Sequence, residues 1–161
     1  MSDPVRVLFV CLGNICRSPT AHGLFRDLVH AQGFDQKIAI DSAGTGDWHV
    51  GRQPDERAII HALDRDIDIR DLKARTVAAE DFDTFDYILA MDKQNLVDLE
   101  AMRPDDFDGY LGLFLDFSTD DSEREVPDPY YGEKQGFQYV LDLVEKGSEG
   151  LLDTIRKRYG F

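Results

Sequence analysis

Short apolar runs alternate with segments of helical pattern along the whole chain, and this alternation limits the fold more than any other feature. Residues 5–10 (VRVLFV) have the apolar, largely β-branched composition of a buried parallel strand. Leu24 and Leu28 recur at helical spacing within residues 19–32, and Gly33 marks the end of that helix. Strands that alternate with helices form parallel sheets with right-handed crossovers and helices on both faces. The sequence therefore predicts an α/β fold.

The same alternation continues to the C-terminus. It predicts further strands over residues 37–41, 85–91 and 110–117, and helices over residues 54–63, 93–102 and 133–159, the last broken near residues 147–150. A length of 161 residues suits a single domain over residues 1–161. Ligands of parallel sheets bind beyond the carboxyl ends of the strands. The loops that follow Val10, Asp41, Met91 and Phe117 should therefore share one rim.

The chain is strongly acidic, with a formal net charge of −14. Residues 80–128 alone contain sixteen Asp and Glu against three Lys and Arg, which predicts a solvated acidic face, with a surface for a basic partner as the alternative. Such a surface repels phosphate backbones and anionic lipid, so neither a nucleic acid nor a membrane is expected as a partner. No apolar run approaches the ~18 residues of a membrane span, and no secretory signal is evident. We expect a cytoplasmic protein.

Two cysteines, Cys11 and Cys16, are too few for a disulfide framework. The four histidines are scattered along the chain, so no zinc site is expected. Neither a metal nor another cofactor is predicted. In a reducing compartment both cysteines should be thiols, and their reactivity becomes the question.

The loop after the first strand, residues 11–18 (CLGNICRS), places a cysteine, an arginine and a hydroxyl group where a helix begins. The unpaired N–H groups of a helix N-terminus and of a curled loop cradle a dianionic phosphate. Arg17 can hold two phosphate oxygens with its planar guanidinium group. Cys11 at the floor of this positive loop is expected to be a thiolate nucleophile, and Ser18 to donate a hydrogen bond to it.

Two residues within this loop are expected to have special backbone conformations. Gly13 should adopt one that a Cβ atom would forbid, and Asn14 a left-handed one.

Asp128 is the best candidate for the acid that protonates a leaving group. It lies between two prolines in residues 126–132 (VPDPYYG), which stiffens the loop, and the neighbouring aromatic residues can desolvate the carboxyl group and keep it protonated. By itself this segment would also suit a simple turn. Its predicted place on the rim after the fourth strand favours the catalytic role.

These segments resemble the low molecular weight protein tyrosine phosphatases. The matching stretches are CLGNICRSP from residue 11, DSAGTGDW from residue 41, DYILAMD from residue 86 and DPYYG from residue 128, in family order over nearly the whole chain. The resemblance implies a four-stranded parallel sheet in the flavodoxin-like order 2-1-3-4. It also implies metal-free hydrolysis of phosphotyrosine in protein substrates. We expect a monomer or weak dimer.

In such an enzyme Cys11 would attack phosphorus, and Arg17 with the amides of the phosphate-binding loop would hold the phosphate oxygens. Asp128 would protonate the phenolate and then activate the water that cleaves the phosphocysteine. The other substrate-binding residues would be Leu12, Gly13, Asn14, Ile15, Cys16, Ser18, Trp48, Tyr130 and Tyr131, with Trp48 and Tyr130 as the walls of the cleft.

Two supporting residues follow from the same resemblance. Asn14 tied to Ser42 would hold the loop in shape, and Asp92 would neutralise and orient Arg17. The residues alone leave simpler roles open: a core anchor for Trp48, a helix cap for Asp92 and a turn serine for Ser42.

One position departs from the family pattern. Many members carry a histidine that braces the loop two residues before an Ala-Arg pair, whereas Leu72 holds that position here. The loop must be braced in another way, and a bacterial-type member is expected because eukaryotic members carry the histidine more often.

Three alternative functions fit parts of the sequence. Arsenate reductases share the fold but need further cysteines, and arginine phosphatases carry threonine where this chain has Ile15. A phosphotyrosine-binding module would lack the nucleophile or the acid. Redox sensitivity is also expected, because Cys16 is close enough in sequence to Cys11 to form a disulfide with it after oxidation.

Overall fold

The first apolar run forms β1 (Val5–Cys11), which lies inside the sheet and is apolar on both faces because helices cover both. The structure is a computed structural model that describes residues 3–120, 122–129 and 134–161. Val7 and Phe9 face one core and Leu8 and Val10 face the other, and none of the four is exposed to solvent. This double burial explains why β1 shows no alternation of polar and apolar residues.

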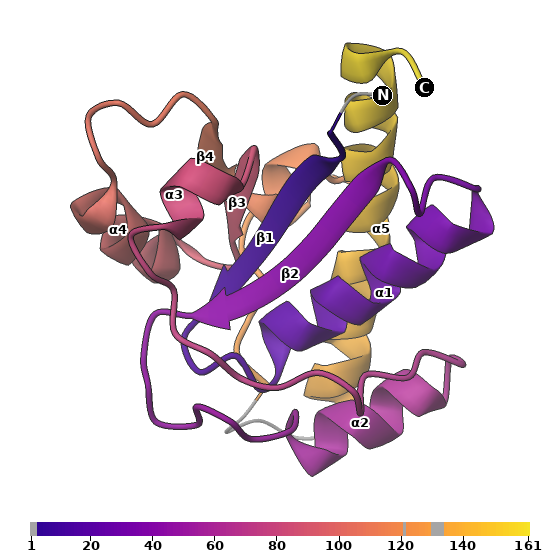
Figure 1. The fold of residues 1–161 in the computed structure, drawn as a ribbon. Helices are drawn as coiled ribbons and strands as arrows, with labels where there is room; N and C mark the ends of the chain where they lie inside the picture. The colour runs from indigo at the N-terminus through magenta and orange to yellow at the C-terminus, as the bar shows by residue number, and fades with distance from the viewer. Residues whose placement is uncertain (1–2, 121, 130–133) are drawn as a thin grey trace.

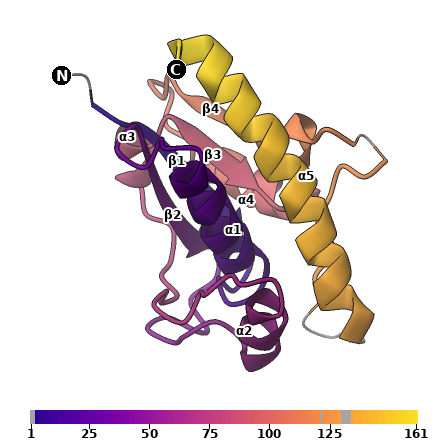
Figure 2. The same ribbon diagram turned by 90° about the vertical axis from the view of Figure 1, so that its right-hand side faces the viewer.

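The other strands are β2 (Ile38–Gly44), β3 (Tyr87–Ala90) and β4 (Tyr110–Leu113). All pairings are parallel, and the 4-stranded sheet has the order β2-β1-β3-β4. The predicted α/β class and strand order are confirmed. Helices α1 (Arg17–Ala31) and α5 (Lys134–Tyr159) cover one face, and α4 (Lys93–Met102) covers the other (Figures 1 and 2).

Two short helices complete the fold. The helix α2 (Glu56–Leu63) packs near α5, and α3 (Asp81–Thr84), which the sequence did not predict, precedes β3. No helix in the described part of the chain is both long and apolar enough to cross a membrane.

The predicted fourth strand over residues 110–117 is too long. The strand ends at Leu113, and the residues that follow form the 3-10 helix η1 (Phe114–Phe117). The predicted break in the last helix is wrong, because α5 continues through Gly147 and Gly150. Both glycines let α5 approach η1 closely. A Cβ atom at Gly147 would lie 2.7 Å from the ring of Phe114, and one at Gly150 would lie 1.6 Å from the carbonyl oxygen of Phe117.

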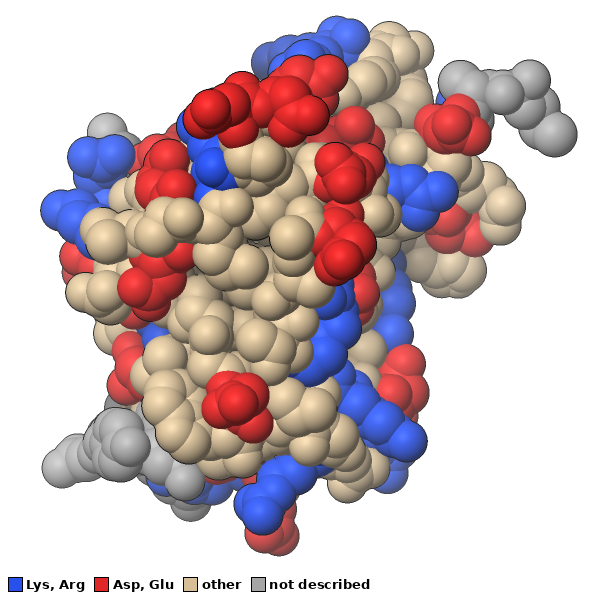
Figure 3. All heavy atoms as spheres, turned by 60° about the vertical axis from the view of Figure 1, so that its left-hand side comes forward, with Lys and Arg blue, Asp and Glu red and all other residues tan. Residues whose placement is uncertain are grey.

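The acidic segment forms one side of the molecule. Its elements α3, α4 and β4 lie together on the left in Figure 1, and most of the described Asp and Glu side chains between residues 80 and 128 are exposed. On the face in Figure 3, Asp and Glu occupy much of the upper part, and Lys and Arg lie mainly along the right-hand and lower edges.

Candidate active site

The loop between β1 and α1 places a thiol and a guanidinium group at the carboxyl edge of the sheet. Cys11 is the last residue of β1, and Arg17 is the first residue of α1. Asn14 has a φ of 56°, the left-handed conformation predicted for it. The prediction for Gly13 is wrong, because its φ is not positive. The missing side chain leaves room for the ring of His49, whose Cδ2 atom lies 3.0 Å from the position of a Cβ atom on Gly13.

Polar groups surround the sulfur of Cys11, a residue that is only 3% exposed. The Oγ atom of Ser18 lies 2.9 Å from Sγ, and the main-chain N–H groups of Asn14 and Ser18 donate to Sγ over 3.3 and 3.4 Å. Hydrogen-bond donors directed at one buried sulfur are suited to a thiolate, since each stabilises negative charge.

Arg17 is buried but well paired. Its NH1 atom donates to Asp92 over 2.6 Å and to the carbonyl oxygen of Val126 over 3.0 Å, and its NH2 atom lies 3.8 Å from Asp128. Burial acts to lower the pKa of Arg17, but the charge of Cys11 and the hydrogen bond and charge of Asp92 outweigh burial and raise it. Arg17 is therefore a permanent cation at the loop.

Asp92 has both roles that the sequence left open. It is the N-cap of α4, where its side chain accepts from Asn95 N over 2.8 Å and completes a capping box, and it also pairs with Arg17. Helix capping and orientation of the guanidinium group thus depend on one carboxylate.

The segment that carries Asp128 is held against the end of β3. Val126 is fully buried, its N–H donates to Met91 O over 2.8 Å, and its carbonyl accepts from Arg17. The adjacent Glu125 accepts from Lys93 N over 3.0 Å at the start of α4. These contacts place the carboxyl group of Asp128 beside the loop.

These groups open into one cavity of about 430 Å³, lined by Cys11, Leu12, Gly13, Ile15, Cys16, Arg17, Trp48, His49 and Asp128. The loops that follow Val10, Asp41, Met91 and Phe117 all meet Arg17 or line this cavity, as predicted from the parallel topology. Trp48 is 67% exposed and its ring lies over Gly46, so it is not a core anchor. Tyr130 and Tyr131 lie outside the described residues.

His49 is a cavity residue that the sequence analysis missed. Its only signal was its place next to Trp48, since a single histidine in a loop carries no pattern.

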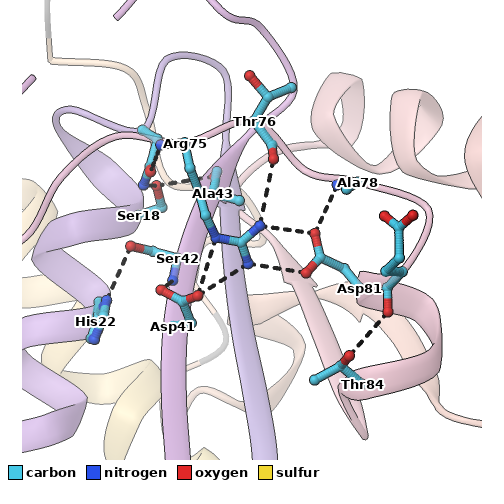
Figure 4. Close-up of polar contacts among 12 residues, drawn as sticks. Ser18, His22, Asp41, Ser42, Ala43, Arg75, Thr76, Ala78, Asp81 and Thr84 are labelled. Carbon is cyan, nitrogen blue, oxygen red and sulfur yellow. Dashed lines mark hydrogen bonds and ion pairs between the residues drawn. The ribbon is translucent and has the colours of Figure 1, made fainter. Parts of the chain in front are cut away.

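The predicted bond between Asn14 and Ser42 is not the one that the structure contains. Asn14 Nδ2 donates to Ser18 Oγ over 2.7 Å, and Asn14 Oδ1 accepts from Arg75 N over 3.0 Å. Ser42 Oγ instead lies 3.1 Å from His22 Nδ1 (Figure 4). Leu72 is partly buried and packs against the core.

His22 and Arg75 were not predicted as parts of the site. Burial and the charge of Arg26 lower the pKa of His22 to about 4, so its ring is neutral at pH 7. No sequence pattern joins either residue to the loop, because each contact depends on the packing of separate elements.

Cys16 differs from Cys11 in its surroundings. It is buried, and burial together with the charge of Asp55 raises the pKa of its thiol, so it stays protonated. Neither Cys11 nor Cys16 is part of a disulfide in the structure. Among the described residues no group of three or more His, Cys, Asp and Glu side chains is placed to hold a metal ion.

The carboxyl edge of this parallel sheet brings together a cysteine sulfur beneath converging hydrogen-bond donors, a buried arginine and a carboxylate. These are the catalytic groups of an α/β phosphatase. Sequence comparison gives the family. Residues 6–159 match the family model described as low molecular weight phosphotyrosine protein phosphatase, and the chain belongs to this family. It is therefore an enzyme, a phosphoric monoester hydrolase of a metal-independent kind.

Individual relatives agree over nearly the full length. The low molecular weight protein-tyrosine-phosphatase YfkJ of Bacillus subtilis is 42% identical over 95% of this chain and 97% of its own. The YfkJ crystal structure superposes with a TM-score of 0.91, at 41% identity and with 98% of each chain covered. A protein tyrosine phosphatase from Entamoeba histolytica gives a TM-score of 0.90 at 38% identity, over 97% of this chain and 98% of its own.

A third structure bears on specificity. A protein named as Drosophila arginine phosphatase has a TM-score of 0.87 and 30% identity, over 93% of this chain and 97% of its own.

Proposed function

We propose that this enzyme hydrolyses phosphotyrosine in proteins, and aryl phosphates, through a phosphocysteine intermediate. The observation that carries the proposal is the sulfur of Cys11, buried beneath converging donors in the same cavity as Arg17 and Asp128. The names of the YfkJ and Entamoeba relatives support tyrosine phosphate as the substrate.

In the first step, Arg17 and the loop amides bind the oxygens of the phosphoryl group. The Cys11 thiolate attacks phosphorus as the bond from phosphorus to the phenolic oxygen breaks, which gives phosphocysteine. Asp128 donates its proton to the departing phenolate. The positive charge of Arg17 stabilises the negative charge of the transition state.

In the second step, water attacks the phosphorus of phosphocysteine. Asp128, now a carboxylate, accepts a proton from that water, and the bond from phosphorus to sulfur breaks. Ser18 Oγ, 2.9 Å from the sulfur, donates a hydrogen bond to the thiolate as it leaves. Inorganic phosphate is released and Cys11 is ready for another cycle.

Trp48 is the described wall on which an aromatic leaving group can stack. Its exposed ring stands at the cavity, where a phenol attached to a bound phosphate would lie. The short side chain of phosphoserine would leave phosphorus above the sulfur, and phosphotyrosine is therefore the preferred substrate.

Phosphoarginine is the second candidate, since the Drosophila arginine phosphatase shares the fold. Ile15 lines the cavity where arginine phosphatases carry threonine, and its apolar side chain favours a phenolic leaving group. Arsenate reduction is disfavoured because the chain has only two cysteines.

Redox control is part of the proposal. Peroxide would convert the Cys11 thiolate to a sulfenic acid, and the Cys16 thiol would then displace its hydroxyl group, forming a disulfide and releasing water. Because the pKa of Cys16 is raised, this second reaction should be slow at neutral pH.

The decisive experiment compares phosphotyrosine, phosphoserine, phosphoarginine and arsenate with the wild type, Cys11→Ser and Asp128→Ala. Cys11→Ser should abolish phosphotyrosine hydrolysis but still bind phosphate, and a chelator should not affect the wild type. Asp128→Ala should reduce the rate about 10²- to 10⁴-fold on an aryl phosphate with a poor leaving group and less on one that needs no proton. Substantial activity in Cys11→Ser would exclude the mechanism.

The cytoplasmic location, the lack of nucleic-acid and membrane partners and the monomeric or weakly dimeric state stay predictions from the sequence.

A further inference from the structure

Residues 74–77, here called the strap, run beside the end of β2 and contact the phosphate-binding loop (residues 11–18). Gly44 N donates to Arg75 O and Val77 N donates to Gly44 O, both over 2.8 Å, which forms a single parallel bridge. On the same side of the strap, Arg75 N donates to Asn14 Oδ1 over 3.0 Å. The strap therefore joins β2 to the residue of the loop that has the left-handed conformation.

This contact determines the direction of a chain of hydrogen bonds that ends at the sulfur. A main-chain N–H can only donate, so Asn14 must turn its oxygen toward Arg75 and its Nδ2 group toward Ser18. Ser18 Oγ accepts from Asn14 Nδ2, so the hydroxyl hydrogen of Ser18 is available to donate. Its closer acceptor is Cys11 Sγ, 2.9 Å away, and the other acceptor in reach, Ala43 O, lies 3.4 Å away. The reverse direction would turn the hydroxyl hydrogen away from the thiolate.

The side chain of Arg75 anchors the strap between two elements. Its guanidinium group donates to both carboxylate oxygens of Asp81 over 3.0 and 3.1 Å and to Asp41 on β2 over 3.1 Å (Figure 4). Asp81 is buried and also accepts from Ala78 N over 2.8 Å. Burial acts to lower the pKa of Arg75, but the hydrogen bond to Asp81 and the charge of Asp41 outweigh it.

The strap lies outside the sheet. Its main chain is tied to Gly44 by the bridge and to residues 51 and 52 by two hydrogen bonds of Ala74, both over 2.8 Å, and the planar pairing of Arg75 with two carboxylates adds a geometric constraint. With Leu72 at the position of the family histidine, the anchor of Arg75 is a brace that remains for the loop.

We propose that Arg75, held by Asp81 and Asp41, is a positioning residue for the nucleophile. Its main-chain N–H sets the direction of the hydrogen bonds through Asn14 and Ser18, so that the Ser18 hydroxyl donates to the Cys11 thiolate. This inference rests on the proposed role of Cys11 in catalysis.

The test measures the pH dependence of Cys11 alkylation by iodoacetamide together with kcat and KM for an aryl phosphate. In Arg75→Gln the midpoint of the alkylation profile should move up by about one pH unit and kcat should fall about tenfold. KM should change less than about threefold, because Arg17 and the loop amides remain. Arg75→Lys, which keeps the charge, should recover part of kcat.

Arg70 provides the matched control. It makes a similar two-oxygen pair with Asp68, over 2.9 and 2.8 Å, but this pair is exposed and does not touch the loop. Arg70→Gln should leave the alkylation profile and kcat unchanged. The other ionisable groups that line the cavity with Cys11 are the same in every variant: Cys16, Arg17, His49 and Asp128.

If circular dichroism shows that Arg75→Gln does not fold, Asp81→Asn takes its place. This variant removes the ion pair between Arg75 and Asp81 and retains a side-chain oxygen that accepts from Ala78 N. An unshifted alkylation profile in a folded variant, even with a lower melting temperature, would overturn the proposal and leave the anchor a purely structural role. Alkylation needs no turnover, so this result is separate from the Cys11→Ser test of the proposed function.

Discussion

Replacing Asp92 with alanine should be unusually destabilising, because one carboxylate performs two tasks. The side chain of Arg17 is 4% exposed and depends on Asp92, 2.6 Å away, for its closest charge partner. Removing one partner of a buried ion pair costs about 3–5 kcal/mol. Asp92 itself is 23% exposed, so the lower end, about 3 kcal/mol, applies. Loss of the N-cap of α4 adds about 1 kcal/mol, for a total of about 4 kcal/mol.

Asp55 is a suitable control, because it caps α2 and pairs with an exposed arginine. Its side chain accepts from Arg57 N over 2.9 Å, and the side chain of Arg57 is 46% exposed. Asp55→Ala should cost about 1–1.5 kcal/mol, since an exposed pair contributes little beyond the cap. Asp92→Asn should lie between the two alanine variants, because asparagine keeps the cap but removes the charge.

Urea denaturation gives the free energies of unfolding, and inhibition by inorganic phosphate reports on Arg17. Asp92→Ala should also weaken phosphate inhibition about tenfold, a loss of about 1.4 kcal/mol in binding, whereas Asp55→Ala should not. Equal losses of unfolding free energy in the two alanine variants, within about 0.5 kcal/mol, would refute the reasoning that the buried ion pair dominates.

Three further predictions concern pH, packing and oxidation. The pKa of His22 is 6.5 in the unfolded chain and about 4 in the folded protein, so the unfolded chain binds more protons between these pH values. About 3 kcal/mol of unfolding free energy should therefore be lost as the pH drops from 6.5 toward 4. Urea titrations at several pH values should show a smaller loss in His22→Gln. Gly150→Ala should destabilise the protein by about 3 kcal/mol, because the new Cβ atom would overlap the carbonyl oxygen of Phe117. Gly136→Ala, where the nearest atom to a Cβ lies at 3.6 Å, should stabilise it by about 0.5–1 kcal/mol. Equal melting temperatures of the two variants would contradict this difference. Peroxide should inactivate the enzyme reversibly through a disulfide between Cys11 and Cys16, and the activity of Cys16→Ser should not recover with dithiol. The disulfide would be excluded if mass spectrometry finds no linked peptide and the variant recovers its full activity.

Local sequence determined much of this protein. The helix over residues 93–102 has the predicted bounds, because the Asp92 cap and the helical pattern lie within one stretch of chain. The strand, loop and helix around Cys11 and Arg17 were likewise evident, since the strand composition, the left-handed Asn14 and the helix start are local properties. Such preferences act over a few residues and leave a pattern that can be recognised without knowledge of the fold.

Only the tertiary structure decided how the loop is held and how the last helix passes the sheet. The contact of Asn14 with Arg75 joins residues 61 positions apart, and that of Ser42 with His22 joins a strand to a helix. Gly150 indicated a break by helix propensity, yet it is needed for the close approach of α5 to η1. Each of these features depends on which surfaces the packed elements bring together, and burial then overrides the local preference of the residue.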